Sequence, residues 1–273
     1  MKRSGVMKGR VKNDSILEVI FIIACLLCIF ISNIDYILSI IIIIGTYILS
    51  FLFLVVFRTK IINSNLDTEK QKKFLYGFIL VFIVYMAIQL YYKFGLNLIN
   101  MMDQYTHNQL RLFQLPLIMT ILLSYFFNIR LRRDFNWGIK LKDFLVIILL
   151  YVLLEIVPLI MSNQVEILMN ISLIDYFKNL VQQIYYPSIV KEVIFRGLLI
   201  SGLIGYGVSH KKSNIIQSII FGLIHILNYN EFSINIILTS CFQMYIGFLL
   251  EKIYLNSRSL TPCILLHALI DTI

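Results

Sequence analysis

Long apolar runs separated by short charged connections dominate this sequence of 273 residues. A helix needs about 20 predominantly apolar residues to cross the hydrocarbon core of a bilayer, and backbone that faces lipid must pair its own polar groups. The chain is 59% hydrophobic and 14% charged, whereas ordinary soluble domains carry about 25% charged residues. These features exclude a soluble domain and predict a protein embedded in a membrane.

The apolar runs have the length and composition of membrane-crossing helices, and about eight or nine such helices are predicted. The runs are Ile16–Ser32, Tyr36–Phe57, Phe74–Tyr92, Leu112–Ile129, Phe144–Met161, Ser188–Val208, Asn214–Leu227, Ile234–Leu250 and Leu260–Ile273. The seventh and the last are short, so we expect them to be tilted, to span half the membrane or to pack inside the bundle. The predicted fold is all-α, a polytopic transmembrane helical bundle with an intramembrane polar cavity.

Basic residues accumulate in alternate connections. Most Lys and Arg precede the first run or follow the second, fourth, sixth and eighth runs, whereas the other connections hold mainly acidic residues. Lys and Arg are enriched in cytoplasmic loops of membrane proteins. The pattern predicts a multi-pass protein of the cell membrane with a cytoplasmic N-terminus. The net charge of +9 therefore reflects topology, and no nucleic-acid partner is expected.

The composition changes near Met161, after which ionisable groups appear inside the apolar runs. We therefore divide one integrated membrane domain into N-terminal transmembrane helices, residues 1–160, and a helical core, residues 161–273. Charged side chains inside a membrane cost several kcal/mol unless they are paired or hydrated, so each is a candidate functional group. Glu192 and Arg196 are four residues apart on one helix face and can form an ion pair. For Glu155, structural and functional roles are equally open.

Two histidines and a second i, i+4 pair add to this set. His225 lies in the seventh run, and the last run carries His267 and Asp271, a spacing that lets the carboxylate orient the imidazole. The loop charges place these groups and Glu192 in the same leaflet. Polar groups from three separate runs at one depth predict an intramembrane site.

The spaced residues resemble a known family. The motifs are Glu192-x-x-x-Arg196-Gly197, Phe221-x-x-x-His225 and His267-x-x-x-Asp271. In order and spacing they resemble the CAAX protease and bacteriocin-processing family, also called Abi, over roughly Met161 to Ile273. The resemblance implies an intramembrane endopeptidase that acts on a membrane-associated or precursor peptide, in bacteriocin processing or self-immunity.

The resemblance also implies roles for the residues. A glutamate and His225 would activate a water molecule, His267 and Asp271 would stabilise the oxyanion, and Arg196 would hold Glu192. The family's first motif usually begins with two adjacent glutamates, and here Lys191 stands in the first position.

Lys191 leaves alternatives open. A buried lysine can act as a base, or Glu192 and His225 can activate water less effectively. Alternatively, the protein is an inactive relative that serves as a membrane binding, immunity or scaffolding protein, in which an ammonium holds a substrate carboxylate. A proton-coupled transporter is a further alternative, although no internal repeat supports it.

No cofactor is expected. A zinc site built from Glu192, His225 and His267 is the alternative, because oxygen and nitrogen ligands bind zinc. Lys191 and Arg196 beside it would repel a dication, which favours a metal-free water mechanism. The expected partners are a peptide or protein substrate and the lipid bilayer.

Overall fold

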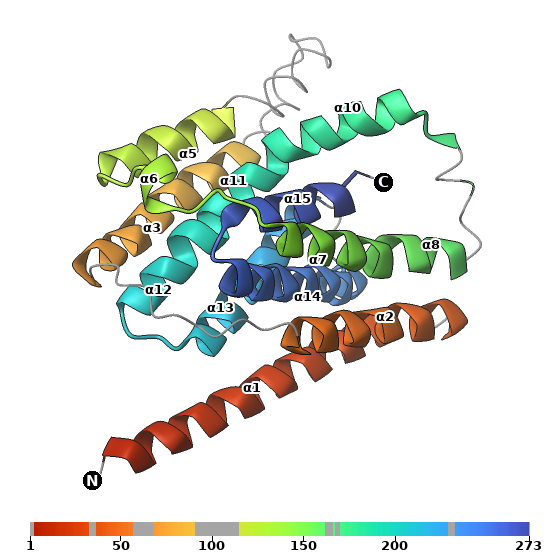
Figure 1. Ribbon diagram of the computed structural model, residues 1–273, viewed down its shortest axis with the longest axis horizontal. Coiled ribbons are helices and arrows are strands. Elements are labelled where there is room, and N and C mark those ends of the chain that lie inside the picture. The colour runs from red at the N-terminus through yellow and green to blue at the C-terminus, as the bar shows by residue number, and fades with distance from the viewer. Residues whose placement is uncertain are drawn as a thin grey trace.

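The computed structural model describes residues 3–32, 37–56, 68–90, 115–161, 166, 170–228 and 233–272. These residues are almost entirely helical and include no strand. Helix α14 lies in the middle of the bundle and packs against α13, α1 and α15 (Figure 1). The predicted all-α membrane bundle is confirmed.

The N-terminal half of the chain supplies the outer helices. They are α1 (Arg3–Ser32), α2 (Ile37–Val56), α3 (Thr68–Leu90), α5 (Leu115–Phe126), the short α6 (Leu131–Asp134) and α7 (Leu141–Tyr151), which continues through the π-helical turn η4 (Val152–Ile156) into α8 (Val157–Met161). Large apolar side chains are exposed on each of the long helices, as is expected of surfaces that face lipid.

The C-terminal half supplies the inner helices, which are preceded by one peripheral helix with no buried residue. Helix α10 (Leu173–Gln183) leads through η5 (Ile184–Ser188) into α11 (Ile189–Glu192), the π-helical segment η6 (Val193–Ile200) and α12 (Ser201–Gly205). Next come α13 (His210–Ile224), the short 3-10 helix η7 (His225–Asn228), α14 (Ile234–Ser257) and α15 (Leu260–Ile270).

Four described helices are long and apolar enough to cross a membrane. They are Asn13–Ile31, Glu69–Leu90, Leu141–Met161 and Ile236–Ser257, and shorter apolar helices cover Ile41–Val56, Pro116–Phe126 and Leu260–Ile270. These agree in position with seven of the predicted runs. The total number of crossings and the orientation in the membrane remain predictions.

Helix α10 was not among the predicted elements. Ser172 caps its N-terminus by accepting a hydrogen bond from the Asp175 backbone at 3.1 Å. Apolar side chains recur every three to four residues and are exposed, including Leu173, Phe177 and Val181. The pattern is that of an amphipathic helix at a membrane surface. Helix α10 is too short and too polar to be found by a search for apolar runs long enough to cross a bilayer.

Lysines from several of the basic connections form ion pairs that bring these connections together. Lys211 and Lys252 both form ion pairs with Glu18 of α1, the former at 3.3 Å. In another group, the Lys70 Nζ of α3 lies 2.6 Å from the Asp134 carboxylate of α6. The connections predicted to share one side of the membrane therefore do lie in contact within these groups.

Asp134 shows how these contacts act on a carboxylate outside the spans. Burial would raise its pKa, but hydrogen bonds from Lys70, from the Arg130 backbone and from Arg133 outweigh burial, so the pKa is lowered. The folded protein therefore favours the charged form of this carboxylate.

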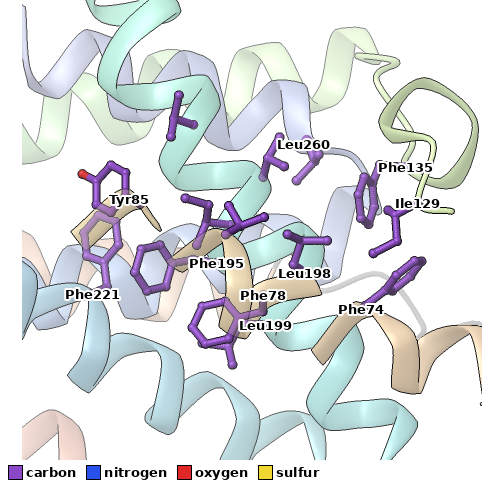
Figure 2. Close-up of a cluster of buried hydrophobic side chains, with 14 of the residues drawn as sticks. Phe74, Phe78, Tyr85, Ile129, Phe135, Phe195, Leu198, Leu199, Phe221 and Leu260 are labelled. Carbon is purple, nitrogen blue, oxygen red and sulfur yellow. The ribbon is translucent and has the colours of Figure 1, made fainter. Parts of the chain in front are cut away.

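An aromatic core links α3 to the inner helices. Figure 2 shows its rings, with Phe195 and Phe221 close together and Phe74 near Phe135. The ring centroids of Phe195 and Phe221 are 5.3 Å apart and nearly perpendicular, a favourable edge-to-face geometry. A Cβ added at Gly222 of α13 would lie only 2.9 Å from the backbone nitrogen of Met244 in α14. A glycine at this position lets the two helices approach closely, and their contact holds Phe221 in place.

Candidate active site

The first element of the site is a fully buried ion pair. Arg196 Nη1 donates to Glu192 Oε1 at 3.1 Å, and neither side chain is exposed. The i, i+4 spacing predicted this pair. Further hydrogen bonds lower the cost of burying such a pair, and Arg196 Nη2 also donates to the Gly247 carbonyl at 2.7 Å. Among the described residues, Arg196 Nε and Glu192 Oε2 have no hydrogen-bond partner.

Phe221 lies between the charged groups. The guanidinium carbon of Arg196 is 4.7 Å from the Phe221 ring centroid, within the range of a cation–π contact. The same ring contacts the imidazoles of His225 and His267, with centroids 4.9 and 5.6 Å away. Phe221 therefore connects η6, α13 and α15 at one point.

His267 lies between two carboxylates. Its Nδ1 donates to Glu192 Oε1 at 2.6 Å, and its Nε2 lies 3.4 Å from Asp271 Oδ2. The imidazole is almost completely buried, whereas the Asp271 side chain is 30% exposed. The firm contact with Glu192 sets the ring orientation, and the longer distance to Asp271 leaves Nε2 less tightly held.

Lys191 and His225 form a separate contact. Lys191 Nζ lies 3.0 Å from His225 Nε2, and His225 Nδ1 lies 2.6 Å from the Phe221 carbonyl oxygen. A carbonyl only accepts, so Nδ1 carries the proton, and Nε2 of the neutral ring accepts from Lys191. The amine therefore occupies the ring nitrogen that would otherwise receive a proton from water.

The structure brings together all of the predicted site residues, in two branches around Phe221. Glu192, Arg196, His267 and Asp271 form one connected chain of contacts, and Lys191 with His225 forms the other. Adjacent residues Lys191 and Glu192 thus engage different histidines. This follows from the turn of about 100° per residue around a helix.

The predicted zinc alternative fits this arrangement poorly. Lys191 occupies Nε2 of His225, while Glu192 is bound by Arg196 and His267. Within the described residues, no group of three or more His, Cys, Asp or Glu side chains has a geometry that could hold a metal ion.

Two further carboxylates lie near the site: one whose role the sequence left open, Glu155, and one that the sequence analysis did not single out, Glu251. Glu155 of η4 interacts electrostatically with Asp271. Glu251 of α14 is completely buried, and neither of its oxygens has a hydrogen-bond partner within the described ranges of the chain. The eighth run was predicted to end at Leu250, which placed Glu251 in a loop. Helix α14 instead continues to Ser257 and buries it.

Polar residues of α13 were also missed. Gln217 Nε2 donates to the Gly247 carbonyl at 2.9 Å, the acceptor that Arg196 also uses, and to Asn214 Oδ1 at 2.9 Å. These side chains extend the buried polar network between α13 and α14. Polar residues at i and i+3 inside an apolar run were the available signal.

The fold and this site define the class: an α-helical membrane protein with a buried site of carboxylate, guanidinium, amine and imidazole groups. Comparison with known families then identifies the relationship. Residues 175–273 match the family described as Rce1-like, type II CAAX prenyl endopeptidase Rce1-like. The match confirms the resemblance to CAAX proteases in the segment that carries the motifs. No curated protein and no solved structure matches the chain.

Proposed function

We propose that this protein is an intramembrane endopeptidase that hydrolyses a peptide bond of a membrane-associated or precursor peptide. The single observation that carries the proposal is the cluster of Glu192, Arg196, His267 and Asp271 inside the segment that matches the Rce1-like family. Peptide hydrolysis needs a base for water, donors for the oxyanion and exclusion of bulk solvent. The cluster supplies groups for each of these tasks.

Glu192 is the proposed base. Its Oε1 accepts from both Arg196 and His267, whereas its buried Oε2 has no hydrogen-bond partner among the residues that the structure describes. A buried acceptor of this kind favours an ordered water. In the proposed reaction, water transfers a proton to Oε2 as its oxygen bonds to the peptide carbonyl carbon. The proton then passes to the leaving amine as the C–N bond breaks.

His267 is the proposed oxyanion donor. Its Nε2 is directed at Asp271 across 3.4 Å, longer than a good hydrogen bond. When Nε2 carries a proton, this N–H can exchange its long contact with Asp271 for a hydrogen bond to the developing oxyanion at little cost in free energy. Arg196 acts as a positioning residue because it fixes the carboxylate of Glu192.

Lys191 supports a second candidate function. Its ammonium has three donors, of which His225 Nε2 takes one. The remaining donors suit a peptide carbonyl or a terminal carboxylate. With His225 occupied in this way, an inactive binding, immunity or scaffolding protein is the alternative. For either function we propose a multi-pass protein of the cell membrane with a cytoplasmic N-terminus, which the alternating basic connections support.

Comparison of peptide termini in membranes tests the primary proposal without a known substrate. Cells expressing wild type, Glu192→Gln or the exposed control Glu69→Gln are compared by quantitative terminal proteomics. We expect new termini with wild type and the control, and a loss of about 100-fold or more with Glu192→Gln, the size expected for removal of a general base. Identical termini in all three, at equal membrane levels, would exclude a peptidase that uses Glu192 as its base.

Lys191 variants separate the two functions. If wild type yields no new termini but Lys191→Glu does, the chain is a degraded enzyme. The binding function predicts that purified wild type captures a short acylated peptide with a free C-terminal carboxylate better than its C-terminal amide. Lys191→Met should remove this preference, and equal capture of acid and amide by wild type would exclude a carboxylate-binding role.

A further inference from the structure

A groove separate from the buried polar site runs beside α5. It has a volume of about 820 Å³, and apolar side chains such as Leu117, Ile121 and Val193 line it. Pockets that hold small ligands have volumes of about 300–1,000 Å³. Thr120 also lines the groove, but its hydroxyl donates to the Pro116 carbonyl at 2.7 Å. This wall therefore offers a ligand mainly apolar contacts.

The groove has cations at one end. Arg130 and Arg132 line it, and within the described part of the chain neither guanidinium forms an ion pair. Asp134 lies in the same turn, but its side chain is only 2% exposed and is bound by Lys70 at 2.6 Å and by Arg133 at 3.4 Å. The carboxylate nearest in sequence is therefore neutralised by other residues, and the end of the groove keeps a positive charge.

The wall at this end is firmly held. Trp137 lines the groove, and its indole N–H donates to the Leu131 carbonyl at 2.9 Å. Thr261 of α15 donates to the Trp137 carbonyl at 2.6 Å.

We propose that the groove binds an anionic glycerophospholipid from the leaflet on the side of Arg130. One acyl chain lies against the apolar wall of α5, and the phosphate headgroup contacts Arg130 and Arg132. An anionic headgroup complements the unpaired guanidinium groups. A zwitterionic lipid matches the apolar wall equally well, but its own ammonium opposes the arginines.

The fluorescence of Trp137 provides a direct assay, because this residue is the single tryptophan of the chain. The full chain is reconstituted in phosphatidylcholine vesicles that contain equal mole fractions of either brominated phosphatidylglycerol or brominated phosphatidylcholine. Bromine on the acyl chain quenches the tryptophan on contact. We expect a relative affinity of the groove for phosphatidylglycerol about fivefold or more above that for phosphatidylcholine, the factor that one arginine supplies near a charged headgroup.

The variant Arg130→Gln/Arg132→Gln should reduce this ratio to near one, whereas Arg133→Gln should retain it. Arg133 is the matched control because it belongs to the same helix and pairs with Asp134 outside the groove. Equal quenching by the two lipids in wild type would show ordinary bilayer contact and overturn the proposal. A preference that survives the double substitution would place the lipid elsewhere and equally overturn it. Circular dichroism establishes that each variant is folded.

Discussion

Replacement of Arg196 by methionine should destabilise the protein severely. Methionine keeps much of the side-chain volume, so the change mainly removes charge. Glu192 would then be left buried, with His267 as its only donor among the described residues. Loss of one partner of a buried pair costs about 3–5 kcal/mol because the remaining charge is uncompensated. The Gly247 carbonyl adds little to this cost, since Gln217 still donates to it.

Unfolding of the purified protein in detergent, followed by circular dichroism, measures this cost. Arg133→Met is the matched control: its side chain is 61% exposed and its ion pair lies at the surface, where such pairs contribute about 0–1 kcal/mol. In Arg196→Met/Glu192→Met, both charges are absent, so the loss should be smaller than the sum of the two single losses by about 1–3 kcal/mol. If Arg196→Met loses no more free energy of unfolding than Arg133→Met, or if the two losses simply add, the argument from buried charge is wrong.

Two further predictions concern packing and pH. Gly222→Ala should lower the free energy of unfolding by about 1–3 kcal/mol, because the new Cβ overlaps α14. Gly45→Ala is the control and should have no such effect, because the space around its Cβ is open. Equal effects of the two substitutions in a thermal unfolding assay would contradict the close approach of α13 and α14. The pKa of Asp134 is lowered in the folded protein, so its contribution to stability is present above the unfolded value of about 3.9 and is lost as pH falls through the folded pKa. The free energy of unfolding, measured between about pH 6 and 2, should therefore be higher for wild type than for Asp134→Asn near pH 6, and this difference should disappear in acid. A difference that stays constant with pH would contradict the Lys70 contact.

Much of the fold follows from local sequence pattern. A bilayer requires long apolar helices, so the runs at residues 36–57 and 74–92 predict α2 and α3 within the part of the chain that the structure describes, although helix is already present at Thr68, ahead of the second run. Helix α10 falls outside this rule because a helix on a membrane surface needs only one apolar face. The end of α14 was also missed, because the apolar run was predicted to end at Leu250, whereas the helix continues to Ser257 and buries Glu251.

The contacts of the candidate site also fall into those that the sequence predicts and those that it does not. The pairs Glu192–Arg196 and His267–Asp271 follow from helix periodicity and were predicted from spacing alone. The contacts of Lys191 with His225 and of Glu192 with His267 join different helices. They depend on the rotation and depth of each helix in the bundle, which packing around Phe221 determines. Spacing within one run carries no information about these quantities.

The charges of the segment through α11 and η6 also bear on how the chain enters the membrane. Lys191, Glu192 and Arg196 lie within two turns, and a charged residue at the centre of a single inserting helix costs about 2.5–3.5 kcal/mol. The Leu, Ile, Phe and Val residues around them each return only a few tenths of a kcal/mol. Alone, this segment is therefore a poor substrate for the translocon. In the folded protein its charges are met by the imidazoles of η7 and α15, so we expect the later helices to stabilise the membrane insertion of this earlier segment.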